Sequence, residues 1–202
     1  MKRISIGVIV LIVTAVFGYQ IISSRTFQFF DGLTYRVSTN EKVVALTFDD
    51  GPLRCTGKIL DLLAATRHKA TFFVIGRNLK DPKLRAFAVR ALREGHDIGN
   101  HSYSHPDFSR VSAKRAEKEI LSTHELIQDV IKESGVDAGR QDLFFRFPYG
   151  VGGSWANYAS TQNVLASLNY HIAFWDLDTN DWRMELQWYP TSPERVLKAL
   201  NR

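Results

Sequence analysis

The sequence predicts an α/β fold with a parallel sheet covered by helices. Short apolar runs recur along the 202-residue chain, and segments whose apolar residues have helical spacing separate them. This alternation indicates parallel strands, because two parallel strands in one sheet need a crossover of a dozen or more residues, usually a helix. An uncharged apolar segment at the amino end adds a transmembrane helix in front of the sheet.

The expected elements follow one another without interruption. We expect strands at residues 43–48, 70–75, 97–98, 143–146 and 171–175, and helices at 58–66, 82–94, 113–134 and 161–168. The longest helix, 113–134, repeats Ile120, Ile127 and Ile131 on one face. A last helix begins at Ser192-Pro193, where serine suits the cap and proline the first turn.

The amino end has the features of a membrane anchor. Residues 4–24 carry no charge, and at about 1.5 Å per residue a helix of this length crosses a bilayer core of roughly 30 Å. Lys2 and Arg3 precede it, which keeps the amino end in the cytoplasm and exports the rest. We expect a signal anchor at 1–25, a juxtamembrane segment at 26–41 and one extracytoplasmic domain at 42–202. Secretion after signal cleavage is the alternative, although no Ala-x-Ala site is present.

Charge and cysteine content exclude several classes of protein. The net charge is +5 and the pI about 9.4, which suits an anionic surface such as a cell envelope. Lysines and arginines are scattered, without the basic stripe of a nucleic-acid binder, so we expect no nucleic-acid partner. Cys55 is the single cysteine, which excludes an internal disulfide and is interpreted as a plain loop thiol.

Two adjacent carboxylates, Asp49 and Asp50, stand where the first strand runs into Gly51-Pro52. Strand ends that open into loops are where α/β proteins place their chemistry. Aspartate, glycine and proline are also what turns use, so the pair alone is consistent with an ordinary turn.

His101 and His105 are candidate metal ligands. Two imidazoles with a carboxylate from a distant strand form a set of three ligands that leaves coordination positions open for water and substrate. Zinc suits such a set best, and cobalt, nickel and manganese compete for it. Pro106 disfavours helix at His105, which places the pair on a loop after the strand at 97–98. Taken alone, two histidines at this spacing could equally be surface residues.

Four blocks in this order and spacing resemble the signatures of the polysaccharide deacetylase family, also called NodB-homology or carbohydrate esterase family 4. They read Thr-Phe-Asp-Asp-Gly-Pro at 47–52, His-Ser-Tyr-Ser-His at 101–105, Arg-Phe-Pro-Tyr-Gly at 146–150 and Asp-Thr-Asn-Asp-Trp at 178–182. The resemblance covers roughly residues 42–182. It implies an irregular (β/α) barrel.

The resemblance also implies a role for each matched residue. Asp50, His101 and His105 match the metal ligands of the family. Asp49 matches its catalytic base, and Arg146 matches the arginine that holds this base. A turn-capping role for Asp49 is the alternative that its position alone leaves open.

The later blocks carry the expected substrate contacts. Tyr149 matches the position whose backbone N–H stabilises the oxyanion. Pro148, Tyr149 and Trp182 are expected to contact substrate, and Asp181 matches the partner of a general-acid histidine. That histidine belongs to a Leu-x-His strand, which the resemblance leads us to expect after Arg202, so we expect the barrel to be incomplete in this chain. We expect His96 to be structural and His124 to be solvent-exposed, and neither to replace it.

Together these features predict a metal-dependent enzyme that deacetylates N-acetylglucosamine residues in a cell-wall or chitin-like polysaccharide. Two alternatives remain: an O-acetyl polysaccharide esterase, and a catalytically impaired metal-binding glycan module that lacks the acid.

Overall fold

The computed structural model describes residues 33–34, 39–140, 142–154, 157–179 and 181–182. The chain divides into two compact units. The larger comprises Gly32–Thr34 and Ser38–Phe174, and the smaller comprises Met1–Asp31, Tyr35–Val37 and Trp175–Arg202. The expected anchor at 4–24 and the helix at Ser192-Pro193 lie outside the described residues. Within the described ranges, no helix has the length and apolar character needed to cross a bilayer.

The larger unit is built on a six-stranded parallel sheet in the order β1-β6-β5-β4-β3-β2. The strands are β1 Leu33–Thr34, β2 Leu46–Gly51, β3 Ala70–Val74, β4 Asp97–Asn100, β5 Phe144–Phe145 and β6 His171–Ala173. The predicted α/β fold with a parallel sheet is confirmed. In the described part of the chain β1 and β2 are the two edges of this sheet, and the irregular, incomplete barrel stays a prediction.

β1 and β2 differ most from the sequence prediction. β1 lies in the expected juxtamembrane segment, where no strand was predicted, and it pairs with β6. β2 begins later than predicted: Val43 and Val44 precede it and are 64% and 78% exposed. It then runs through both carboxylates to Gly51, with an irregularity in its pairing to β3 between Phe48 and Gly51. Such bulges change the direction of side chains, and this one falls on the two aspartates.

The helices follow the apolar periodicity closely. They are α2 Thr56–Thr66, α3 Pro82–Arg93, α4 Ala113–Ser134 and α5 Tyr158–Ser167. Ser112 caps α4 by accepting a hydrogen bond from the Arg115 N–H, and Gly135 ends it with a left-handed φ of 73°. α4 therefore has the predicted bounds.

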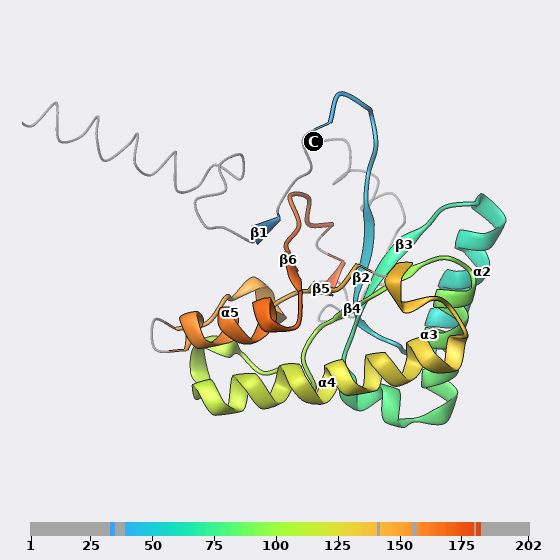
Figure 1. Ribbon diagram of the computed structural model, residues 1–202. Helices are drawn as coiled ribbons and strands as arrows, with labels where there is room; N and C mark the ends of the chain where they lie inside the picture. Colours follow the sequence, from blue (N-terminus) through green and yellow to red (C-terminus); the bar gives the residue numbers. More distant parts are fainter. Residues whose placement is uncertain (1–32, 35–38, 141, 155–156, 180, 183–202) are drawn as a thin grey trace, which may run out of the picture. The chain divides into compact units, whose positions relative to one another are not determined.

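α4 packs against α3 along one part of its length and against α5 along another, and it contacts β4 (Figure 1). Its buried face supplies Ile120, Ile127 and Val130, all with no exposed surface. The main core lies between the sheet and helices α2 to α4; its buried members include Leu60, Phe72, Val74, Leu92, Ile98 and Ile127.

His124 on α4 was predicted to be solvent-exposed, and this is wrong. It is half-buried, and its Nδ1 lies 3.1 Å from the hydroxyl of Tyr170. Burial lowers the pKa of His124 and raises the pKa of Tyr170 to about 12, so both groups are neutral near pH 7. The sequence position of His124 on a helix did not reveal a partner 46 residues away.

Candidate metal centre

The predicted site residues meet at the carboxyl ends of neighbouring strands. Asp49 and Asp50 belong to the end of β2, His101 follows β4 directly, and Arg146 follows β5. Parallel strands bring their carboxyl ends to the same edge of the sheet, which is why residues far apart in sequence come together there.

Asp50, His101 and His105 form one cluster whose ligand atoms all lie within 4.8 Å of one another. Asp50 Oδ1 is 3.1 Å from His105 Nε2 and 3.5 Å from His101 Nε2. Two ligands of a tetrahedral ion with bonds near 2.1 Å are separated by about 3.4 Å. The spacing of the carboxylate from each imidazole therefore fits a zinc-sized ion, and two imidazoles with one carboxylate are ligands that zinc accepts.

A backbone carbonyl fixes which ring nitrogen of His101 carries the hydrogen, and this leaves the other nitrogen able to bind a metal. Its Nδ1 lies 2.7 Å from the carbonyl oxygen of Arg146. Because a carbonyl oxygen only accepts hydrogen bonds, Nδ1 carries the hydrogen, and the lone pair of Nε2 faces Asp50. Burial lowers the pKa of His101, which favours the neutral imidazole. This arrangement is typical of metal-binding histidines.

Backbone strain is concentrated at this cluster. Asp50, Ser102, His105 and Tyr149 have φ values of 66°, 68°, 61° and 59°, in the left-handed region that residues other than glycine rarely adopt. The two other such residues in the described ranges, Arg67 and Asn169, lie where α2 and α5 end, a common place for this conformation. Strained residues that gather away from helix ends are typical of functional sites.

Arg146 joins the carboxylate of Asp49 to the body of the fold. Its Nη1 donates to Asp49 Oδ1 and to Thr47 Oγ1, each at 2.8 Å. The Arg146 side chain is 3% exposed and that of Asp49 30%, so the cation is buried and the carboxylate reaches solvent. Asp49 is thereby oriented beside the metal cluster with access to water.

Three further contacts fix the Arg146 guanidinium. It lies 3.9 Å above the ring centre of Phe73, in cation–π geometry. Its Nε donates to the carbonyl of Ala173 and its Nη2 to that of Phe174, both at 3.2 Å. Sequence reasoning missed Thr47 and Phe73 as supports. Thr47 stands inside the first block, which was a usable signal, whereas nothing local marks Phe73.

The matching family model is that of polysaccharide deacetylase, and it spans residues 36–173. The chain belongs to the polysaccharide deacetylase family. The membership of this family that the four sequence blocks predict is therefore confirmed.

Individual polysaccharide deacetylases resemble the chain over most of its length. The peptidoglycan-N-acetylmuramic acid deacetylase PdaC of Bacillus subtilis is 36% identical over 73% of this chain and 28% of its own. A peptidoglycan-N-acetylglucosamine deacetylase of Bacillus cereus is 39% identical over 71% of this chain and 48% of its own. The chain thus spans less than half the length of these two relatives.

A solved structure shares the fold. The Bc1960 peptidoglycan N-acetylglucosamine deacetylase, crystallised with an N-hydroxybenzamide, superimposes with a TM-score of 0.67 at 34% identity, over 83% of this chain and 70% of that one. The NodB-type parallel sheet of this chain is thus the architecture of its family.

The third family block places Tyr149 beside the metal cluster. Its ring contacts that of His105 edge to face, with centres 4.6 Å apart, and the residue is 66% exposed. Its left-handed φ turns the chain sharply between Pro148 and Gly150. Pro148 is buried, and its predicted contact with substrate stays a prediction.

The fourth family block belongs to the smaller unit and is described only locally. Thr179 Oγ1 donates to Asp181 Oδ1 at 2.8 Å, and Trp182 is 54% exposed. The roles of Asp181 and Trp182 in catalysis and substrate binding stay predictions.

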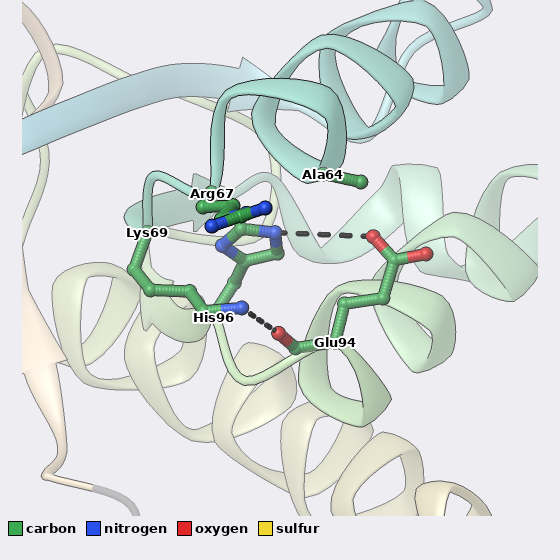
Figure 2. A pocket seen from close by; sticks show the side chains of 5 residues that line it. All are labelled: Ala64, Arg67, Lys69, Glu94 and His96. Carbon is green, nitrogen blue, oxygen red and sulfur yellow. Dashed lines mark hydrogen bonds and ion pairs between the residues drawn. The ribbon is translucent and has the colours of Figure 1, made fainter.

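A separate pocket of about 330 Å³ lies at the opposite, amino ends of β3 and β4, lined by Ala64, Arg67, Lys69, Glu94 and His96 (Figure 2). His96 is 1% exposed, and its Nδ1 accepts the N–H of Ala70 at 3.2 Å. Its Nε2 therefore carries the hydrogen and faces Glu94 Oε2 at 3.9 Å, and neither atom has a hydrogen-bond partner in the described structure. A structural role for His96 stays a prediction, and the residue lies at the other end of β4 from the metal cluster.

Proposed function

We propose that this chain is a metal-dependent hydrolase that removes the acetyl group from N-acetylglucosamine residues of a cell-wall or chitin-like polysaccharide. One observation carries the proposal: a three-ligand cluster, Asp50 with His101 and His105, lies next to a second carboxylate, Asp49, that a buried arginine orients. Peptidoglycan is the polymer named for both relatives described above, although they differ in the sugar that they deacetylate.

Asp50, His101 and His105 would hold the ion, and zinc is our first choice, with cobalt, nickel and manganese as competitors. When bound, such an ion polarises an acyl oxygen and makes water more acidic. Asp49 is exposed, and Arg146 holds it through one oxygen. It takes the proton from the attacking water as the oxygen of that water adds to the acetyl carbon.

Tyr149 is the proposed donor to the oxyanion. Its left-handed backbone and its ring on His105 hold its peptide near the cluster. Cleavage of the carbon–nitrogen bond then releases acetate, and the departing amine takes up a proton. Asp181 and Trp182 are proposed to assist these later steps, as the partner of the general acid and as a wall of the acetyl pocket.

Acetate release from an N-acetylglucosamine oligomer tests the proposal. The chelator-treated chain should be inactive, and added zinc should restore release. Acetate from an O-acetylated xylan but not from the oligomer would favour the esterase instead. Zinc binding without acetate from either polymer would indicate a non-catalytic glycan module.

We also propose that residues 4–24 anchor the chain and that the domain at 42–202 faces outward. The uncharged segment and its basic flank support this. The protein should stay with membranes through a high-salt wash, because hydrophobic insertion is not screened by salt. Recovery in the medium with a new amino terminus would show cleavage and secretion.

A further inference from the structure

A buried carboxylate on α4 contacts the loop that carries both metal-binding histidines. Residues 101–105 are called the metal loop below. Glu119 lies in the second turn of α4, and its side chain is 4% exposed. Burying a carboxylate is costly unless its oxygens are paired, so its partners indicate why it is there.

The partners of Glu119 are mainly in the metal loop. Oε2 accepts the backbone N–H of Ser104 at 2.6 Å, and Oε1 accepts the Ser104 hydroxyl at 2.8 Å. Arg115, one turn earlier on α4, donates to Oε1 at 2.9 Å and also approaches Ser104 Oγ at 3.3 Å. An exposed ion pair one turn apart on a helix is worth only about 0.5 kcal/mol, which would not by itself account for a buried carboxylate.

Ser104 directly precedes His105, whose left-handed φ of 61° is unfavourable for a histidine. The peptide that joins these two residues must be held for His105 Nε2 to face Asp50. Its own N–H, that of His105, donates to Ser102 Oγ at 3.1 Å, and Glu119 holds the preceding peptide through the Ser104 N–H. The two peptides that lead into the strained residue are thus both fixed by hydrogen bonds.

The neighbouring residue of α4 fixes the start of the same loop. Asn100 Nδ2 donates to the backbone carbonyl of Ile120 at 3.0 Å, and Asn100 Oδ1 accepts the N–H of Ser102 at 2.9 Å. Ser102 is the other strained residue of the loop, with φ 68°. α4 therefore supports both left-handed residues of the metal loop, through Glu119 and through the carbonyl of Ile120.

We propose that Glu119 is a positioning residue of the metal centre: through Ser104, it sets the backbone that aims His105 at Asp50. This role rests on the metal site of the proposed function. It does not require Glu119 to contact metal or substrate. Partners of this kind behind metal ligands typically contribute about 10- to 100-fold in metal affinity.

The test is the zinc affinity of the full chain, purified in mild detergent, by competition with a chromophoric chelator. Glu119→Ala should weaken zinc binding by about 10- to 100-fold. Glu119→Gln should recover most of this loss, because its carbonyl oxygen can still accept the Ser104 N–H. Ser104→Ala keeps the N–H but loses the hydroxyl, so its zinc affinity should lie between those of Glu119→Gln and Glu119→Ala.

Ser134→Ala is the matched control. Ser134 is also a buried polar residue of α4, 7% exposed, but within the described residues its hydroxyl bonds only the local backbone: it donates to the Ile131 carbonyl and accepts the Val136 N–H. This variant should lose stability without losing zinc affinity. The visible absorption spectrum of bound cobalt gives a second measurement, which should change in Glu119→Ala and stay unchanged in Ser134→Ala.

The outcomes separate the positioning role from the metal site. If the parent chain binds zinc and Glu119→Ala binds it as tightly with the same cobalt spectrum, the positioning role is wrong and Glu119 only stabilises the fold. If the parent chain binds no zinc, the metal site itself is wrong, and this role with it. Should Glu119→Ala fail to fold, the zinc affinity of Ser104→Ala decides: an affinity equal to that of the parent would overturn the proposal, and a weaker one would support it.

Discussion

Arg146 Nη1 donates to Asp49 Oδ1 at 2.8 Å, and the arginine is buried while the aspartate reaches solvent. Burial lowers the pKa of Arg146, and the charge of Asp49 and its hydrogen bond oppose this. The same guanidinium lies over Phe73 and donates to two backbone carbonyls, of Ala173 at the end of β6 and of Phe174 just after it. The orientation of the proposed base is therefore tied to the packing of three strands.

Replacing Arg146 by methionine should lower the free energy of unfolding by about 2–3 kcal/mol. The change leaves Asp49 and several buried acceptors without their donor, and the partial exposure of Asp49 moderates the loss. Urea unfolding of the metal-free chain measures it. Arg146→Lys is the control, since it retains the positive charge but not the several N–H donors of the guanidinium. Stability equal to that of the parent in both variants would contradict the contacts described.

The two adjacent aspartates should respond differently to the same substitution. Asp50→Asn should lose stoichiometric zinc, because it removes the carboxylate ligand. Asp49→Asn should keep zinc and lose acetate release by about 10² to 10⁴, the usual contribution of a general base. Metal analysis and acetate assays on both proteins check this, and loss of zinc from Asp49→Asn would show that the assigned roles are wrong.

Gly99→Ala should weaken the support of Arg146 without touching it directly. A Cβ at this position in β4 would lie 2.5 Å from Cδ1 of Phe73, whose ring is 1% exposed and lies beneath the guanidinium. Overpacking a core of this kind costs about 1–3 kcal/mol. Phe73→Leu in the same background should relieve part of the loss in urea unfolding; additive losses would indicate that the two sites do not interact.

His96 should make the protein less stable in mild acid. Burial, with the nearby charge of Lys69, lowers the pKa of His96 below its ordinary 6.5. Below about pH 6.5 the unfolded chain binds a proton at His96, whereas the folded chain binds it only at lower pH. The contribution of neutral, buried His96 to the free energy of unfolding is therefore complete above about pH 6.5 and is lost as pH falls through the folded pKa.

His96→Asn tests this dependence, because its amide oxygen can still accept the Ala70 N–H without titrating. Between pH 7.5 and 5.5, the free energy of unfolding of the metal-free parent should fall more than that of the variant. Since His101 and His124 also have lowered pKa values, the difference between the two proteins is the quantity to compare. Parallel curves would mean that His96 does not titrate in this range.

Local patterns predicted the helices and the residues of the metal centre. α4 has the predicted bounds because helix hydrogen bonds join residues four apart. Its cap, its apolar face and its terminal glycine can therefore all be recognised within one short stretch of sequence. Asp50, His101 and His105 could be named because their blocks resemble those of the family, and parallel topology then explains why they meet at one edge of the sheet.

Tertiary structure alone decided how these residues are held. β1 is two residues long and exists through its pairing with β6, so no local pattern marks it. Arg146 bonds Thr47 across 99 positions, and Glu119 bonds Ser104 across 15, beyond the reach of helix or strand periodicity. The left-handed backbone at Asp50 and His105 is likewise unfavourable in isolation. The sequence therefore identified these residues as ligands, but the orientation of their side chains depends on contacts with the surrounding structure.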